Sequence, residues 1–342
     1  MSSKIRWGIL GTGAIAKQFA KGLSVLPNAE LVAVGSRSKE SASAFGDSFG
    51  IPRRHASYQA LAADAEVDVV YIATPHPMHA ENTMLCLEAG KHVLCEKPFT
   101  INAPEARDIV AYARAHKLFL MEAMWTRFIP IIAKAREWIQ EGAIGKVRMV
   151  TADFGFRASL DETSRLMDPA LGGGGLLDVG IYPISFAAMA FGATPIHVSG
   201  HAHLGETGVD EQAGILLTFP GGGLGVLACA VRTNTPHEAY ILGEEGQIRI
   251  HAPFWKATTA TLTQGENDPM TIELPHTGNG YNYQADEVMR CIRAGKLESD
   301  VMPLDESLCL MRVMDELRAQ WKMCFPSELM PGLPKASSVE PA

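Results

Sequence analysis

The sequence predicts an α/β protein of two domains: a doubly wound parallel sheet, followed by an α/β domain with a large, mostly antiparallel open sheet. Three observations predict this class. Up to residue 123, short apolar segments alternate with helical patterns. A glycine-rich turn follows the first apolar segment. Beyond residue 124, strand patterns separated by turn residues dominate instead.

Five segments of the N-terminal region are apolar along nearly their whole length, which is typical of strands buried on both faces of a parallel sheet. The predicted strands are 4–10, 30–36, 67–73, 91–95 and 118–122. Helical patterns lie between them, at 14–25, 38–48, 77–89 and 103–116. This alternation predicts right-handed crossovers within one doubly wound sheet. We assign this domain to residues 1–123.

The second domain is assigned to residues 124–325. A helix is predicted from Ile129 to Glu141, and the glycines at 221–223 predict a hairpin turn. Helical patterns at 281–294 and 304–321 end the domain, and the tail at 326–342, rich in Pro and Ser, is expected to be extended. The predicted strands are 146–156, 196–203, 212–219, 224–232, 238–242, 246–250 and 258–263.

Composition excludes several classes of function. A chain of 342 residues exceeds one ordinary core, and 38 acidic against 30 basic side chains disfavour a nucleic-acid partner. The first strand begins by Ile5, which leaves no room for a secretory signal, and no apolar stretch approaches the ~20 residues that span a bilayer. The six cysteines lack Cys-x-x-Cys spacing. We therefore expect a cytoplasmic protein with reduced thiols and no membrane anchor.

A Gly-x-Gly-x-x-Ala turn follows the first strand and opens a helix. The first glycine permits a tight turn, the second lets a pyrophosphate approach the backbone, and Ala16 lets helix and strand pack closely. The helix N-terminus adds free N–H groups. The segment predicts dinucleotide binding through Gly11, Thr12, Gly13, Ala14 and Ile15.

The end of the second strand bears on the choice between NAD and NADP. A site for NAD usually places Asp or Glu there to bind the ribose 2′-hydroxyl. Here the strand ends in Ser36-Arg37, and the first carboxylate is Glu40. A hydroxyl and a guanidinium suit a 2′-phosphate, which favours NADP over NAD. Arg37 as a surface residue at a turn is the alternative.

The loop after the third apolar strand, Thr74-Pro75, is expected to contact the cofactor, because ligands bind at the carboxyl ends of parallel strands. His76 and His79 have a spacing that two metal ligands can use. No third ligand follows, so we predict no metal site.

Lys97 follows the strand at 91–95, where the nicotinamide would lie, and Asp178 and Tyr182 are four residues apart. If their segment is helical, the two share a face, with the helix beginning near Gly180 because of Pro183. A nearby cation favours the phenolate of a tyrosine, which otherwise titrates near ~10. Tyr182 would then accept an alcohol's proton while Asp178 orients the substrate or the lysine. A core tyrosine and a surface lysine remain the alternative.

These motifs together resemble one family. Segments 11–16, 74–79 and Glu96-Lys97-Pro98 are similar to the glucose-fructose oxidoreductase / inositol dehydrogenase (Gfo/Idh/MocA) family of NAD(P)-dependent oxidoreductases. Segments 94–98, 121–128, 173–182 and 206–210 resemble its branch of dimeric dihydrodiol and NADP-dependent D-xylose dehydrogenases. The resemblance extends from about residue 5 to 325.

The resemblance implies an N-terminal Rossmann domain and a substrate-binding domain whose open sheet pairs two subunits as a homodimer. It implies Lys97 and Tyr182 as the catalytic pair beside Asp178, and a Lys97–Pro98 peptide that is often cis. It places two groups of residues around the ligands: Glu96, Lys97 and Arg127 with the segments above at the cofactor, and Trp125, Phe154 and Trp255 at the substrate.

The predicted activity is therefore NADP-dependent oxidation of a hydroxyl of a cyclic polyol or aldopyranose, such as D-xylose at C1 or a trans-dihydrodiol. A redox-neutral sugar enzyme with tightly bound cofactor is one alternative, acting in glycoside cleavage or in coupled sugar oxidation and reduction. A non-catalytic NADP sensor is the other, although a sensor requires neither Lys97 nor Tyr182.

Overall fold

The computed structural model describes residues 4–159 and 164–329 and divides the chain into two compact units. The first unit comprises residues 1–128 and 276–308, and the second comprises 129–275 and 309–342. Residues 276–308 thus group with the N-terminal sheet, whereas the sequence analysis assigns them to the second domain. Their helix α8 (Tyr281–Arg293) packs on α1 (Ala14–Leu23), where Gly22 leaves room for Asn279 and Tyr281.

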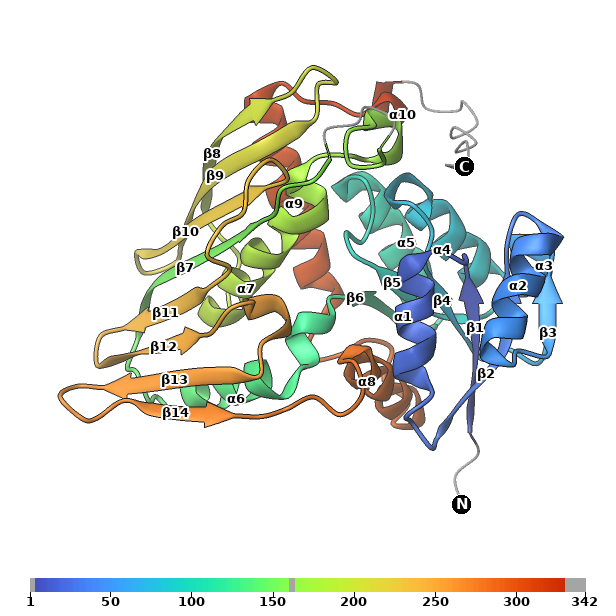
Figure 1. Ribbon diagram of the computed structural model, residues 1–342, viewed down its shortest axis with the longest axis horizontal. Helices are drawn as coiled ribbons and strands as arrows, with labels where there is room; N and C mark the ends of the chain where they lie inside the picture. The colour runs from blue at the N-terminus through green and yellow to red at the C-terminus, as the bar shows by residue number, and fades with distance from the viewer. Residues whose placement is uncertain (1–3, 160–163, 330–342) are drawn as a thin grey trace. The chain divides into compact units, whose positions relative to one another are not determined.

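The first unit is built on a six-stranded parallel sheet in the order β3-β2-β1-β4-β5-β6 (Figure 1). β1 and β4 are fully buried where they pair, as their apolar sequences predict. The strands are β1 (Ile5–Leu10), β2 (Ala29–Gly35), β3 (Arg53–His55), β4 (Val69–Ile72), β5 (His92–Glu96) and β6 (Leu120–Ala123).

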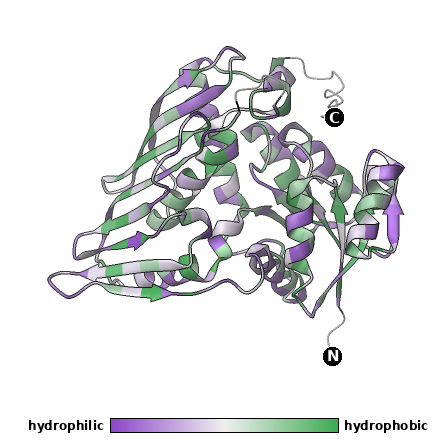
Figure 2. Ribbon diagram, viewed as in Figure 1, coloured by the Kyte–Doolittle hydropathy of each residue, from purple (hydrophilic) through white to green (hydrophobic). Residues whose placement is uncertain are grey.

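Helices connect these strands on both faces of the sheet, which confirms the predicted doubly wound class. The edge strand β3 and the short helix α3 escape sequence reasoning, because three residues, Arg-Arg-His, carry no apolar pattern (Figure 2). The helices are α2 (Lys39–Phe49), α3 (Tyr58–Ala62), α4 (His79–Glu88) and α5 (Ala103–Ala115), with 3₁₀ turns η1 (His76–Met78) and η2 (Trp125–Phe128).

The second unit is built on an eight-stranded sheet in the order β14-β13-β12-β11-β7-β10-β9-β8. All its neighbours are antiparallel except β7 and β10, as the sequence predicts for a mostly antiparallel sheet. The glycine turn at 221–223 joins β9 and β10 as a hairpin. The strands are β7 (Val147–Gly155), β8 (His197–Leu204), β9 (Asp210–Phe219), β10 (Gly223–Ala230), β11 (Ala239–Gly243), β12 (Gly246–Ile250), β13 (Thr259–Gln264) and β14 (Met270–Glu273).

Helices pack on one face of this sheet: α6 (Pro130–Gln140) contacts β13, α7 (Ile181–Phe191) contacts β7 and β10, and α9 (Leu304–Trp321) places Leu317 against Gly200. Short turns η3 (Pro169–Leu171) and η5 (Phe254–Lys256) accompany them. One prediction for the tail is wrong: Pro326–Leu329 forms the helix α10, because its Glu328 binds Arg318 of α9. The rest of the tail, 330–342, lies outside the described residues.

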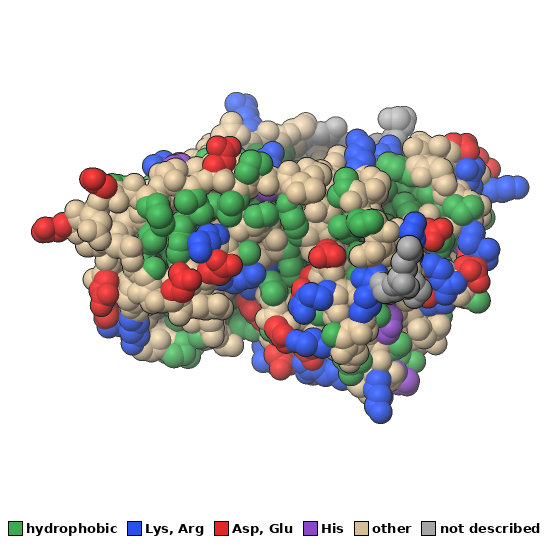
Figure 3. All heavy atoms as spheres, turned by 90° about the horizontal axis from the view of Figure 1, so that it is seen from below, with side chains coloured by type: hydrophobic (Ala, Val, Ile, Leu, Met, Phe, Trp, Pro, Cys, Tyr) green, Lys and Arg blue, Asp and Glu red, His purple; other side chains and the backbone are tan. Residues whose placement is uncertain are grey.

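The segment Pro169–Phe191 is long and apolar enough to cross a membrane, but 89% of its apolar window is buried inside the protein. It is therefore the central segment of a core. Elsewhere, acidic and basic side chains are interspersed on the face of the molecule that Figure 3 shows, in keeping with the small negative net charge.

Candidate active site

The glycine turn after β1 has the geometry that a pyrophosphate requires. Gly11 has φ +107°, and a Cβ there would lie 2.8 Å from the carbonyl oxygen of Ala73. Gly13 begins α1 without a side-chain cap, and apart from its own chain neighbours no atom of the described residues lies within 4 Å of a Cβ built on it. The first N–H groups of α1 therefore open onto free space, which fits the phosphates of a dinucleotide.

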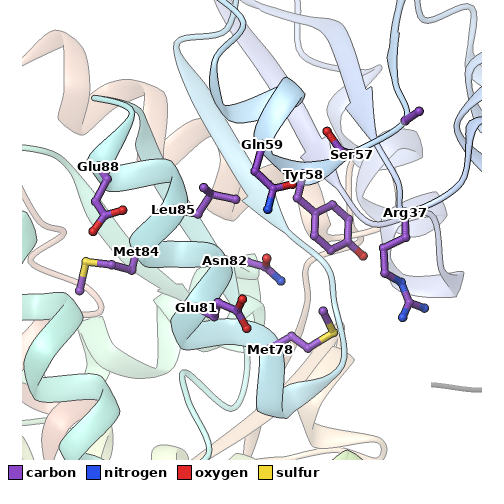
Figure 4. A pocket seen from close by; sticks show the side chains of 11 residues that line it. Arg37, Ser57, Tyr58, Gln59, Met78, Glu81, Asn82, Met84, Leu85 and Glu88 are labelled. Carbon is purple, nitrogen blue, oxygen red and sulfur yellow. The ribbon is translucent and has the colours of Figure 1, made fainter. Parts of the chain in front are cut away.

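A cavity of about 610 Å³ lies beside the end of β2. Arg37 and Tyr58 form one side of it, and α4 forms the other with Asn82, Leu85 and neighbours (Figure 4). The Tyr58 hydroxyl interacts with the exposed Arg37 guanidinium; burial raises the pKa of Tyr58, and the Arg37 charge opposes that rise. Ser36, in contrast, is 7% exposed and joins β3 through its backbone N–H.

Tyr58 is a residue of this cavity that the sequence reasoning missed. It lies on α3, a five-residue helix whose apolar pattern is too short to detect. Ser57 caps that helix by accepting from Ala60 N–H. A serine at this position is a sequence signal for the start of a helix.

His79 joins two loops of the first unit. It is fully buried, and its two ring nitrogens lie 2.7 Å from the carbonyl oxygen of Pro98 and 2.8 Å from that of Thr74. Thr74, itself 7% exposed, also accepts from Asn82 through its hydroxyl. The loop after β4, with Thr74-Pro75, is thereby fixed to the turn after β5.

That turn carries Lys97, which is partly exposed, and its Lys97–Pro98 peptide is cis. Lys97 N–H donates to Glu96 Oε2 at 3.2 Å, and Phe99 N–H donates to Glu122 Oε1 at 3.1 Å. Burial raises the pKa of both carboxyls to about 7, against the opposing effect of nearby cations and these hydrogen bonds.

Trp125 and Arg127 both have partners inside the first unit. Trp125 is 5% exposed and its ring stacks on Tyr281 with centroids 4.5 Å apart. Arg127 is 3% exposed and forms an ion pair with Glu306 near the start of α9. Within the protein, Trp125 therefore packs on Tyr281 and Arg127 pairs with Glu306. The ligand contacts expected for both residues stay predictions.

Tyr182 lies at the start of α7, immediately after a π-helical turn, Leu176–Gly180. The helical segment thus begins four residues earlier than the Pro183 argument predicted. Asp210, from β9, makes this start possible: its buried carboxylate accepts from Leu176 N–H at 2.6 Å. Burial raises the pKa of Asp210 to about 7, while the backbone N–H groups oppose the rise. In the sequence, Asp210 belongs to the similarity segment 206–210, which does not indicate this role.

Asp178 extends from the π-helical turn and accepts from Arg165 Nη2 at 2.7 Å. The Asp178 side chain is 14% exposed and that of Arg165 is 40% exposed. Sequence reasoning missed Arg165, which carries no motif.

An aromatic cluster surrounds Tyr182. Phe154 stacks on Trp255 with centroids 3.4 Å apart, and it lies 5.3 Å from the Tyr182 ring. His237, at φ +66°, contacts both Phe154 and Trp255 edge-on. The second unit thus brings together three predicted residues, Phe154, Trp255 and Tyr182, and adds His237, which no sequence motif indicated. Such a set of rings suits the apolar face of a cyclic substrate.

Among the residues that the structure describes, no three His, Cys, Asp or Glu side chains gather as metal ligands.

Residues 5–124 match the model of an oxidoreductase family with an NAD-binding Rossmann fold, and residues 132–249 match that of the GFO/IDH/MocA C-terminal domain. The chain belongs to the Gfo/Idh/MocA family. The family resemblance drawn from the motifs is thereby confirmed.

Curated relatives agree over nearly the whole chain. It is 42% identical to trans-1,2-dihydrobenzene-1,2-diol dehydrogenase of Mus musculus, covering 95% of this chain and 99% of the mouse protein. It is 39% identical to the Homo sapiens protein of the same name, again over 95% and 99%.

Two solved structures share the fold. An aldose-aldose oxidoreductase from Caulobacter crescentus, in complex with glycerol, has a TM-score of 0.86 at 26% identity, over 93% of this chain and 98% of that one. A 3-ketoreductase from Actinomadura kijaniata, in complex with NADP and TDP-benzene, has a TM-score of 0.80 at 26% identity, with the same coverage. The Gfo/Idh/MocA chain described here is an NAD(P)-dependent oxidoreductase acting on CH–OH groups, of the sugar or polyol dehydrogenase type.

Proposed function

We propose that this chain is an NADP-dependent dehydrogenase that oxidises one hydroxyl of a cyclic polyol or aldopyranose, with D-xylose at C1 and a trans-dihydrodiol as the first candidates. The observation that carries the choice of cofactor is the end of β2. Arg37 projects there beside Tyr58, where a site for NAD usually has a carboxylate. The names of the curated relatives support the substrate class.

Residues of the first unit would hold the cofactor: the backbone at Gly11–Ile15 the pyrophosphate, Arg37 with Ser36 the 2′-phosphate, and Thr74-Pro75 with Glu96 and Lys97 the nicotinamide end. When bound, the cofactor supplies the acceptor for the hydride that leaves the carbinol carbon.

Residues of the second unit would hold the substrate and move its proton. Tyr182 would accept the proton of the reacting hydroxyl, and Asp178 would orient the substrate. Lys97, which belongs to the first unit, would favour the phenolate form of the tyrosine. The stacked rings of Phe154 and Trp255 offer an apolar surface to a six-membered ring.

Initial rates of nicotinamide reduction at mildly alkaline pH test this proposal. The substrates are D-xylose, D-glucose, a trans-cyclohexanediol and myo-inositol, each with NADP and with NAD. We expect turnover with D-xylose or the diol, and a preference for NADP. Arg37→Ala should lower kcat/KM for NADP about 10–100-fold, as for loss of one charged contact, and leave that for NAD nearly unchanged. An unchanged NADP preference in Arg37→Ala contradicts the cofactor assignment.

A redox-neutral reaction is the second candidate, favoured by the similarity to the aldose-aldose oxidoreductase. That reaction would keep the cofactor bound between half-reactions. Absorbance of the purified protein distinguishes the two: a nicotinamide band that survives gel filtration, together with no net reduction in the rate assay, would favour the redox-neutral enzyme.

We further propose a homodimer through the open face of the second sheet. Leu216, Leu224 and Val226 of β9 and β10 are 52, 40 and 42% exposed, and Leu216 pairs with Val226 across the strands. Light scattering after gel filtration tests this. We expect a dimer mass for the native chain and a monomer mass for Leu216→Lys, and a monomeric native chain would contradict the proposal.

A further inference from the structure

The turn at Lys97–Phe99 has polar backbone atoms held by buried side chains. Glu96 accepts from Lys97 N–H, Glu122 accepts from Phe99 N–H, and His79 contacts the Pro98 carbonyl oxygen. Glu96 is 4% exposed, and the other two are fully buried. In a loop, no neighbouring strand supplies such bonds, so side chains have to provide them.

One of these side chains is held by a second one. The Tyr71 hydroxyl, from β4, donates to Glu96 Oε1, while Glu96 Oε2 accepts from Lys97 N–H. Tyr71 is fully buried, and its ring stacks on Phe19 of α1 with centroids 3.7 Å apart and planes 13° apart. A chain of contacts thus connects α1 to the Lys97 backbone: Phe19 stacks on Tyr71, Tyr71 donates to Glu96, and Glu96 accepts from Lys97 N–H.

Stability alone does not account for this arrangement. Burying a carboxyl is costly, and apolar residues of similar volume often serve a core as well or better. Two buried carboxyls, Glu96 and Glu122, nevertheless meet the same three-residue turn. A catalytic group needs side chains around it that are themselves fixed by packing and hydrogen bonds, because errors of about 1 Å reduce rates strongly.

We propose that Tyr71 and Glu96 are positioning residues: Tyr71 orients the Glu96 carboxylate, and the carboxylate fixes the backbone of Lys97. The proposal rests on the catalytic role proposed for Lys97. It gives Glu96 a task that its side chain performs inside the protein, in addition to the cofactor contact expected for it.

Tyr71→Phe tests the inference, because it removes one hydroxyl and keeps the stacked ring. Tyr240→Phe is the matched control. Tyr240 lies in β11 of the second unit, and its hydroxyl also donates to a glutamate, Glu238, at 2.9 Å. Glu96→Gln is the second variant and serves if Tyr71→Phe folds poorly. The two readouts are amide hydrogen exchange, followed in the peptide that contains Lys97, and steady-state rates with D-xylose and NADP.

In Tyr71→Phe we expect exchange in the Lys97 peptide to accelerate about tenfold, kcat to fall about tenfold, and KM for NADP to stay within about twofold. The control should match the native enzyme in both readouts. A general structural role would instead accelerate exchange across the whole sheet and leave kcat unchanged.

Unchanged exchange in the Lys97 peptide overturns the inference, and so does accelerated exchange with a native kcat. Failure of the proposed function has a different signature. Native turnover in Lys97→Met would contradict that function, whatever exchange Tyr71→Phe displays.

Discussion

Lys97 lies in a turn between β5 and α5, and three side chains bind the backbone of that turn: Glu96 at Lys97, His79 at Pro98 and Glu122 at Phe99. Tyr182 lies in a helix, where the helix itself provides most backbone hydrogen bonds and one carboxylate, Asp210, binds the first N–H. Both regions use buried carboxyls with a pKa raised to about 7. In this turn two carboxyls and one histidine bind the backbone, whereas at the start of the helix one carboxylate binds a backbone N–H and later residues bond within the helix.

The difference predicts different consequences of substitution. Around Lys97, losing one contact should loosen a short loop and affect catalysis first. Around Tyr182, losing Asp210 should weaken the start of a central core helix and affect stability first, because α7 is buried on all sides from Ile181 to Ala190.

The largest effect is expected at the two reactive side chains themselves. Lys97→Met and Tyr182→Phe should each lower kcat by about 10²–10⁴-fold, the usual contribution of general acid–base catalysis. NADPH binding, followed by its fluorescence, should persist in both. If only one variant loses turnover, the two regions do not act as a pair, and the mechanism fails.

The second effect concerns the helix start. Asp210→Ala should lower the free energy of unfolding by about 2–3 kcal/mol, because it leaves the buried Leu176 N–H without an acceptor. Urea unfolding measures this, with exposed Asp268→Ala as the control and Asp210→Asn as a partial rescue that keeps an acceptor oxygen. A loss equal to that of the control would mean that the helix start needs no carboxylate.

The third prediction tests whether the two regions share one pH dependence. Glu122 and Asp210 have folded-state pKa values near 7, against about 4 in the unfolded chain, so the folded state binds the proton more tightly. Their contribution to stability is present below about pH 4 and is lost as the pH rises towards 7.

Glu122→Gln and Asp210→Asn each replace a titratable carboxyl with an amide, so the variant lacks the pH dependence that this carboxyl contributes. The unfolding free energy of the native chain minus that of either variant should fall by about 1 kcal/mol per pH unit between pH 5 and 7, and level off above pH 8. Urea unfolding at six pH values measures both curves. A flat curve for one variant would show that its carboxyl titrates normally and would separate the two regions.

The smallest effect is expected at Arg165, whose ion pair with Asp178 is partly exposed. Arg165→Gln should change the free energy of unfolding by less than about 1 kcal/mol, as for most exposed ion pairs. Its KM for D-xylose should rise several-fold if Asp178 needs Arg165 to hold its orientation. Arg249→Gln, which breaks the partly exposed Arg249–Glu238 ion pair, is the control. An equal KM for D-xylose in both variants would show that Arg165 does not hold Asp178 in place for the substrate.

The sequence by itself determined the elements whose chemistry is local. The apolar strands β1, β4 and β5 followed from unbroken apolar runs, and the cofactor turn followed from Gly11, where a Cβ would collide with the Ala73 carbonyl oxygen. The motifs also gave Lys97 and Tyr182 as candidates for the catalytic pair. The short polar strand β3 and the exposed strand β14 were missed, because neither has an apolar pattern that distinguishes a strand from a loop.

The tertiary structure decided what depends on residues far apart in the chain. Asp210 binds a backbone N–H 34 residues away, and Tyr71 binds a carboxylate 25 residues away. Tyr58 meets Arg37 only because β3 and α3 bring them to one cavity. Spacing along a chain records turns of one helix or strand, whereas burial and partners of a carboxyl arise from packing between elements, which no local pattern encodes.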